Sequence, residues 1–334
     1  MAPHSSTRLR VAAIRFLNPA PLMWDFDHPP HAAALAERYE IHSTTPALCA
    51  DELLSGRADL GLIPIASLTP DLAIVPGSTI ASLDCVRSIQ LIVKLNRAGA
   101  PHLASEMWER TTSNVRVPHS RAASSRVSGK EEVPDNIDPG LIDQVLRSVR
   151  TVASDTASRS SLVYAQLLFR KFLSLDPAFL SAPADPIAML AHADAALLIG
   201  DPALLALEDR ARIEAAAGPC LWLDLAHQWH TRTGLPWVAA VWAVRPESLT
   251  HASLSPADLI ADLTRSRDCG LANIDALVAK WAPRIALPPD TIRRYLTRNI
   301  HYTLDSECIA AITHLRALAA EAALLPPLPN LRFL

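Results

Sequence analysis

Short apolar runs of strand length alternate with helical patterns along most of this chain. The first run spans 9–14 and precedes a helical pattern near 32–36, and a later run at 152–154 precedes a helical pattern over 162–172. Such alternation indicates a parallel sheet whose faces are covered by helices. With 334 residues, the chain has enough material for two lobes, each with its own core. The sequence therefore predicts an α/β fold.

A polar turn follows the first predicted strand at 16–22, with the sequence Phe-Leu-Asn-Pro-Ala-Pro-Leu. Pro19 and Pro21 prevent a simple continuation as strand or helix, so Asn18 is held at the carboxyl end of the strand. Ligands bind at this edge in open α/β sheets. We therefore treat Asn18 as a candidate site residue, with an ordinary turn or cap role as the alternative.

A second polar group, which we call the hydroxyl cluster, occupies 155–161, where a predicted strand passes into a helix. The N–H groups at the amino end of a helix bind carboxylate or phosphate, and an arginine can grip a carboxylate with two hydrogen bonds. A set of helix caps with an exposed arginine is the alternative. The hydroxyl and guanidinium side chains of the cluster are Thr156, Ser158, Arg159, Ser160 and Ser161.

Ser88 is a further polar residue beside a predicted strand. It follows Arg87 at the start of a strong strand pattern over 86–94. The local sequence alone gives it no role beyond that of a polar strand residue.

The sequence lacks the motifs of several common enzyme and nucleotide-binding classes. There is no G-x-S-x-G elbow for a hydrolase, and no G-x-G-x-x-G or Walker loop for a nucleotide. His227 and His230 lie three residues apart without an evident third ligand, so we expect no metal site.

The charge pattern and the cysteines argue against other classes of protein. The net charge is −3 and the Lys and Arg residues form no strong cluster, so no nucleic-acid partner is expected. The five cysteines lack C-x-x-C spacing, which argues against a disulfide framework or structural zinc site and fits a reducing compartment. No apolar run has the length of a membrane span or the character of a signal peptide. We therefore expect a cytoplasmic protein without a membrane partner.

One segment interrupts the alternation of strands and helices. From about 97 to 137 the chain is rich in Ser, Arg, Pro and Glu and poor in large apolar residues. Such a composition buries too little apolar surface to offset the entropy of ordering. We predict a mostly disordered surface insertion at 97–137.

Motifs in a fixed order extend over nearly the whole chain outside that insertion. In one-letter code they are FLNPAPL at 16–22, LLSGRADLGLIP at 53–64, IAS at 80–82 with VRSIQL at 86–91, DTASRSS at 155–161, LIGD at 198–201, and DL at 224–225 with TGLPW at 233–237. Near the end of the chain, YLT at 295–297 and NIHY at 299–302 also fit. Together they resemble the chorismate dehydratases of the futalosine route to menaquinone. The resemblance implies a cytoplasmic enzyme with the two-lobed fold of type 2 periplasmic binding proteins and a ligand cleft between the lobes.

The resemblance also implies a reaction and its residues. The family removes water from chorismate to give 3-[(1-carboxyvinyl)oxy]benzoate, no cofactor is expected, and the enolpyruvyl carboxylate of the substrate serves as the base. Asn18 and Ser88 match the residues that orient this arm, so they are the expected catalytic residues. The hydroxyl cluster is expected to bind the ring carboxylate. Arg15, where the family has a small residue, either adds a carboxylate contact or changes the substrate preference.

The same resemblance divides the chain into lobes. Lobe one is expected to contain 1–92 and 238–334, and lobe two 93–237, with strands 86–94 and 237–244 as hinges. Two alternatives stay open at this point. One is a non-catalytic cytoplasmic protein that binds a small carboxylate in the same cleft, and the other is the related 1,4-dihydroxy-6-naphthoate synthase.

Overall fold

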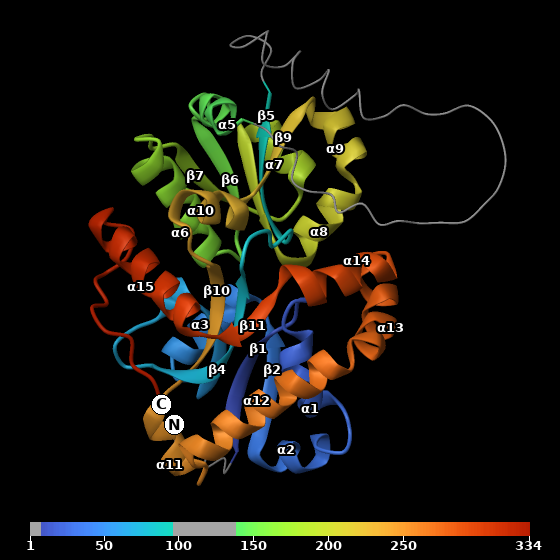
Figure 1. The fold of residues 1–334 in the computed structure, drawn as a ribbon, viewed down its shortest axis with the longest axis vertical. Helices are drawn as coiled ribbons and strands as arrows, with labels where there is room; N and C mark the ends of the chain where they lie inside the picture. The colour runs from blue at the N-terminus through green and yellow to red at the C-terminus, as the bar shows by residue number, and fades with distance from the viewer. Residues whose placement is uncertain (1–7, 96–137) are drawn as a thin grey trace, which may run out of the picture.

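The computed structural model describes residues 8–95 and 138–334, so the insertion expected at 97–137 lies outside the described residues. The described chain forms two sheets, which lie one above the other in Figure 1. Sheet A has the strand order β11 (His301–Leu304), β4 (Ala73–Ser82), β10 (Trp237–Val244), β3 (Leu60–Pro64), β1 (Leu9–Ile14) and β2 (Tyr39–Thr44). Sheet B has the order β7 (Ala178–Ala182), β6 (Thr151–Asp155), β8 (Ala195–Ile199), β5 (Ile89–Lys94) and β9 (Cys220–Asp224).

Both sheets are mixed, which corrects the expectation of a parallel sheet. In sheet A, β1 pairs in parallel with β2 and β3, whereas β10 runs antiparallel to β3 and β4. In sheet B, β6 is parallel to β7 and β8, whereas β5 is antiparallel to β8 and β9. The antiparallel strands β5 and β10 are the first strands after each passage between the sheets. The alternation of strand and helix patterns in the sequence does not reveal where the chain crosses from one sheet to the other.

The chain passes from sheet A to sheet B between Ser82 and Ile89, and it returns to sheet A at β10. Ser88 therefore precedes the strand, and the element expected over 86–94 begins three residues later, at Ile89. Arg87 has a φ of 63°, which turns the backbone immediately before Ser88. We call the parts of the molecule built on the two sheets the sheet A lobe and the sheet B lobe.

Helices cover both sheets, as Figure 1 shows. The helices of the sheet A lobe are η1 (Ala20–Met23), α1 (Trp24–Asp27), α2 (Ala32–Arg38), α3 (Pro46–Leu54), η2 (Ile65–Ser67), α11 (Pro246–His251), α12 (Pro256–Ala272), α13 (Ile274–Ile285), α14 (Pro289–Arg294), η4 (Tyr295–Asn299) and α15 (Ser306–Glu321). Those of the sheet B lobe are α5 (Pro139–Leu146), α6 (Ser160–Leu167), η3 (Leu168–Phe172), α7 (Pro186–His192), α8 (Gly200–Glu208), α9 (Arg210–Ala217) and α10 (Leu225–Thr233). Strand β11 begins at His301, between η4 and α15.

The starts of these helices follow simple sequence rules. Proline stands in the first turn where its missing N–H costs nothing, as at Pro46 and Pro256. A side-chain oxygen at the preceding position accepts a backbone N–H that would otherwise lack a partner. The residues that cap in this way are Thr45, Asp138, Asp185, Asp224, Ser255 and Asp305.

Strand β10 lies between β3 and β4 and is buried along most of its length, with Trp237 and Trp242 at 1% and 0% exposure. Helix α6 of the other lobe also reaches this strand, because the Tyr164 hydroxyl donates to Val238 O at 3.1 Å. The Ser160 hydroxyl similarly donates to Ala239 O at 2.9 Å. These contacts tie the sheet B lobe to the strand on which the chain returns to sheet A.

The C-terminal tail packs beside β4 of the sheet A lobe. Ile74 N donates to Arg332 O at 2.8 Å, and Leu334 N donates to Ile74 O at 3.1 Å. Phe333 forms an isolated parallel bridge with Ile74. Among the described residues, no helix is both long and apolar enough to cross a membrane.

Candidate functional site at the junction of the two lobes

The turn after β1 reaches both lobes. Leu17 N donates to Asp201 Oδ1 at 2.9 Å, a contact with the first turn of α8 in the sheet B lobe. Asn18 O accepts from the Tyr302 hydroxyl of β11 at 2.9 Å. The structure therefore places Asn18 where the lobes meet, with its backbone held from both sides.

Ser88 lies at the same junction and is 1% exposed. Its carbonyl accepts from Gly200 N at 2.8 Å, and the preceding Arg87 N donates to Asp224 Oδ2 at 2.5 Å. The Ser88 side chain also neighbours the phenol of Tyr295. The Asn18 turn and the Ser88 backbone thus both contact the first turn of α8.

Two buried tyrosines line this junction. Burial raises the pKa of Tyr295 well above the usual range for a phenol, although the neighbouring Ser88 hydroxyl opposes the rise. Burial likewise raises the pKa of Tyr302. Both phenols are therefore neutral at physiological pH, and the Tyr302 hydroxyl donates its hydrogen to Asn18 O.

Several buried polar atoms at this junction have no hydrogen-bond partner among the described residues. A buried polar group without a partner costs roughly 1–3 kcal/mol, so native proteins contain few of them. Four of the eight such atoms among the described residues lie on the segments that meet near the lobe boundary, where a bound ligand would give them partners. The atoms are Asn18 Oδ1, Ser158 Oγ, Tyr295 Oη and Asn299 Oδ1.

The hydroxyl cluster forms the turn from β6 into α6. Asp155 holds this turn by accepting from Ala157 N at 2.9 Å and, through its carbonyl, from Ser158 N at 3.0 Å. Ser158 and Ser161 are buried, whereas Thr156 is exposed. The Ser158 hydroxyl has no hydrogen-bond partner among the described residues, whereas the side chains of Arg159 and Ser160 already have partners.

Arg159 and Ser160 are engaged across the lobe boundary. Arg159 NH2 lies 2.7 Å from Asp51 Oδ1 of α3, and NH1 lies 3.5 Å from Ser67 Oγ. Ser160 Oγ accepts from Ala66 N at 3.3 Å, in addition to its bond to β10. Arg159 thus lies in the cluster as expected, and its guanidinium is paired with a carboxylate of the protein.

Arg15 is exposed at the end of β1, and only its backbone N is bonded, to Thr44 O at 3.0 Å, among the described residues. It lies in the same turn as Asn18, three residues earlier. Arg15 is therefore exposed and is not part of the buried group around Ser88.

A cavity of about 280 Å³ opens between α8 and α14 and is lined by Arg87, Leu207, Glu208, Thr291 and Arg294. Its volume is close to that of a small organic ligand. Two of its five lining residues are arginines. It begins one residue from Ser88, but neither Asn18 nor the hydroxyl cluster lines it.

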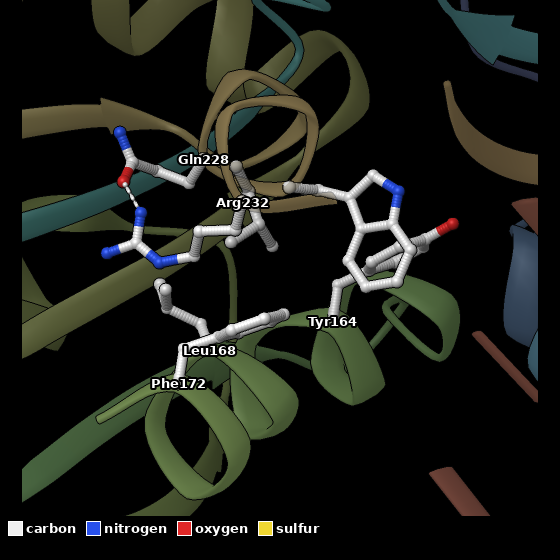
Figure 2. Close-up of a pocket in the computed structure, with 7 residues that line it drawn as sticks. Tyr164, Leu168, Phe172, Gln228 and Arg232 are labelled. Carbon is white, nitrogen blue, oxygen red and sulfur yellow. Dashed lines mark hydrogen bonds between the residues drawn. The ribbon is translucent and has the colours of Figure 1, made fainter. Parts of the chain in front are cut away.

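Figure 2 shows a second cavity, inside the sheet B lobe between α6, η3 and α10. Its volume is about 10 Å³, which is room for about one water molecule rather than a substrate. Arg232 crosses it and donates to Gln228 Oε1 at 3.0 Å, next to the ring of Phe172. This cavity is a packing feature of the lobe.

Two groups of side chains have the composition of metal ligands. Asp84, Cys85 and His227 bring ligand atoms within 4.8 Å of one another, as do His301, Asp305 and Cys308. In each group the histidine already pairs with the aspartate, at 2.5 Å and 2.7 Å. Burial also raises the pKa of the Cys308 thiol to about 12, which disfavours the thiolate that binds metals. His230 contacts Leu235 O instead.

Asp201 is a site residue that the sequence analysis did not select. Burial raises the pKa of its carboxyl to about 6, and the amide of Leu17 opposes this rise. Tyr295, Asn299 and Tyr302 were also not selected, although all four residues fall in stretches that match the family motifs. The motif match was the available signal, because a buried acid has no local sequence pattern of its own.

The raised pKa of Asp201 leads to a prediction about stability. A carboxyl whose pKa is raised by folding contributes stability below its unfolded value near 4, and this contribution is lost as the pH rises through about 6. Asp201→Asn removes this charge and can still accept from Leu17 N. We expect the variant to exceed the wild type in unfolding free energy by on the order of 2 kcal/mol at pH 8, and to match it near pH 4.

Urea unfolding of both proteins at pH 4.5, 6 and 8 measures this difference. The other acids with raised pKa values, such as Asp155 and Asp224, are present in both proteins and cancel in the comparison. A difference that does not grow with pH would show that the Asp201 carboxylate is not destabilised by burial.

Comparison with known proteins assigns the chain to a family. A family model described as menaquinone biosynthesis matches residues 9–124 and 138–321. The chain belongs to this family. Membership gives the protein a role in menaquinone biosynthesis and indicates an enzyme. It confirms the family that the sequence motifs indicated.

Solved structures of distant sequence share the fold. Protein AF1704 from Archaeoglobus fulgidus has a TM-score of 0.62 at 14% identity, covering 96% of this chain and 100% of that one. The alkanesulfonate-binding protein SsuA from Xanthomonas axonopodis pv. citri, bound to MOPS, has a TM-score of 0.58 at 16% identity, covering 96% and 95%. The Candida albicans CA3427 gene product, described as having the generic periplasmic binding protein fold, has a TM-score of 0.56 at 11% identity, covering 96% and 92%. These likenesses confirm the predicted two-lobed α/β fold.

Proposed function

We propose that the protein is a chorismate dehydratase, a hydro-lyase that converts chorismate to 3-[(1-carboxyvinyl)oxy]benzoate and water. The observation that carries this proposal is the group of unpartnered buried polar atoms around Asn18 and Ser88, in a member of the menaquinone biosynthesis family. Two separate lobes meet at this group. The motifs that contribute Asn18 and Ser88 are those that match chorismate dehydratases.

In the proposed reaction, a proton leaves C3 of the ring and the hydroxyl group leaves C4, so that one water molecule is released. The ring becomes aromatic, which supplies the thermodynamic drive. The enolpyruvyl carboxylate of the substrate takes the proton and gives it to the departing hydroxide, which leaves as water, and Asn18 and Ser88 hold this arm against C3. The neutral Tyr295 adds a further donor beside Ser88. No acid–base pair of the protein is needed for the first proton transfer.

The hydroxyl cluster is proposed to bind the ring carboxylate. The Ser158 hydroxyl, which lacks a partner, and Arg159 are the groups best suited to it. Arg159 must first exchange Asp51 for the substrate, and both side chains of this pair are partly exposed, at 34% and 45%. Such a pair is worth at most about 1 kcal/mol, so the exchange is inexpensive. The basic cavity beside Ser88 suits the approach of an anionic substrate.

Release of Arg159 from its protein partner is expected to strengthen substrate binding. We predict that Asp51→Asn lowers KM for chorismate by about 3- to 10-fold and changes the unfolding free energy by less than about 1 kcal/mol. Steady-state kinetics and urea unfolding measure the two effects. Asp176→Asn is the matched control, because it releases Arg170 from a 2.7 Å pair elsewhere in the sheet B lobe. An unchanged KM in Asp51→Asn would mean that Arg159 does not bind substrate.

The lobes predicted from the sequence, 1–92 with 238–334 and 93–237, are the units that we propose to close on the substrate. The passage between Ser82 and Ile89 and the return to β10 are the places where hinge motion would occur. Closure would exclude water from the junction and strengthen its polar contacts. Formation of an aromatic product from chorismate by the purified protein tests the proposed function.

A further inference from the structure

The carboxylate of Asp201 accepts fewer hydrogen bonds than the carboxylate of an ordinary helix cap. Among the described residues its carboxylate accepts one backbone amide, from Leu17 at 2.9 Å. Asp224, which caps α10, shows the contrast, because it accepts from several amides. A buried carboxylate with one donor is poorly stabilised, so its presence calls for a role other than stability. The amides bound by Asp224 belong to Val86, Arg87, Ala226 and His227.

The bond from Leu17 fixes the turn that carries Asn18. Phe16 packs on Gly200, where a Cβ would lie 2.5 Å from Phe16 Cδ2, and the φ of Gly200 is +64°. Leu17 comes next and is held through its amide, and the carbonyl of Asn18 is then held by the Tyr302 hydroxyl. The backbone is therefore anchored on each side of the Asn18 side chain.

The same helix start also reaches Ser88. Gly200 N donates to Ser88 O at 2.8 Å, one residue before Asp201. The first turn of α8 thus contacts the turn of Asn18 in one lobe and the backbone of Ser88 at the passage to the other. The charge of Asp201 also contributes to the raised pKa of Tyr295, which neighbours Ser88.

We propose that Asp201 is a positioning residue: its carboxylate holds the Leu17 amide and thereby sets Asn18 opposite Ser88. The inference rests on the proposed function for the identity of the substrate, but not for the contact itself. The role is geometric, so any acceptor of the same shape should fulfil it. A role of the charge in proton transfer would instead require the carboxylate.

Three variants test this role. Asp201→Ala removes the acceptor, Asp201→Asn keeps an oxygen at the same place, and Glu321→Gln breaks a different contact between the lobes, the 2.8 Å pair with Lys171. We expect Asp201→Ala to lower kcat by about 100-fold with KM changed by less than about threefold, because misplacement of an orienting group affects the transition state. Asp201→Asn should restore kcat to within about fivefold of the wild type, and Glu321→Gln should leave it unchanged.

A second readout does not depend on chorismate. Hydrogen exchange at the Leu17 amide should accelerate by about tenfold in Asp201→Ala and stay within about threefold of the wild type in Asp201→Asn. If the wild type forms no product from chorismate, the proposed function fails, and the exchange measurement still decides whether Asp201 holds the turn. If Asp201→Ala does not fold, the kinetics of Asp201→Asn and the exchange at its Leu17 amide carry the test.

The following results would overturn the proposal. Unchanged protection of Leu17 in Asp201→Ala would show that the carboxylate does not hold the turn. Equal losses of kcat in Asp201→Asn and Asp201→Ala would show that the charge is required. A loss of kcat in Glu321→Gln as large as that in Asp201→Ala would show a general weakening of the contact between the lobes.

Discussion

Asn18→Ala is expected to lower kcat for chorismate dehydration by about 100-fold or more, with little or no loss of stability. The side-chain oxygen of Asn18 is buried and has no hydrogen-bond partner among the described residues. Truncation therefore removes no native hydrogen bond, and it relieves the cost of an unsatisfied buried group, which is roughly 1–3 kcal/mol. The melting temperature should accordingly stay the same or rise. Activity and stability are thus expected to separate.

Steady-state kinetics and thermal unfolding of the same preparation check this separation. Ser88→Ala should behave in the same direction, since Ser88 lies in the same buried group. Asn273→Ala is a suitable control, because its exposed side-chain amide follows the end of α12 and donates to Cys269 O at 2.8 Å. If activity and melting temperature fell together in Asn18→Ala, Asn18 would be a structural turn residue, which is the alternative that its local sequence leaves open.

Gly270→Ala is expected to lower the unfolding free energy by roughly 3 kcal/mol or more. Gly270 lies inside α12, where the intrinsic preference for alanine would instead stabilise the helix by about 1 kcal/mol. An added Cβ would lie 2.1 Å from Pro21 O and 2.6 Å from Pro21 Cα. These are backbone atoms of η1 and cannot move aside as a flexible side chain could. The steric effect therefore outweighs the helix propensity.

The position of this clash matters for the site. One turn earlier in α12, Ser266 donates to Leu22 O at 2.8 Å and accepts from Asp25 N at 3.0 Å. Helix α12 thus supports η1, which follows directly after the Asn18 turn. Urea unfolding measures the loss, with Gly234→Ala as control: its φ is +69° and a Cβ there meets nothing within 4 Å. That control should cost only about 1–2 kcal/mol, and a Gly270→Ala protein as stable as the wild type would contradict the close packing.

The sequence predicts the strands and helices that are determined by residues close together in the chain. The strand at Leu9–Ile14 and the helix at Pro46–Leu54 follow from apolar pattern, proline and cap, and the structure has both. The direction of strand pairing is not local, because β5 and β10 acquire their antiparallel neighbours only when the chain passes between the sheets. The alternation of elements therefore gives the class of fold but not the mixed sheets.

The candidate site shows the same limit. Asn18 and Ser88 can be selected from motifs, and the structure brings their backbones to the first turn of α8. Asp201 could not be selected, because its significance lies in burial and in a bond to Leu17, 184 positions away in the chain. The engagement of Arg159 by Asp51 was equally hidden, since an arginine beside hydroxyls looks the same in sequence whether its partner is a ligand or another residue.

The most direct test of the proposed function is incubation of the purified, metal-free protein with chorismate, followed by mass spectrometry and ultraviolet spectroscopy. The proposal predicts a product lighter by one water, with the absorption of an aromatic ring, and with formation that depends on Asn18. Saturable binding of chorismate without any product would contradict a dehydratase and favour a binding protein that uses the same cleft. Neither binding nor product would remove chorismate as the substrate.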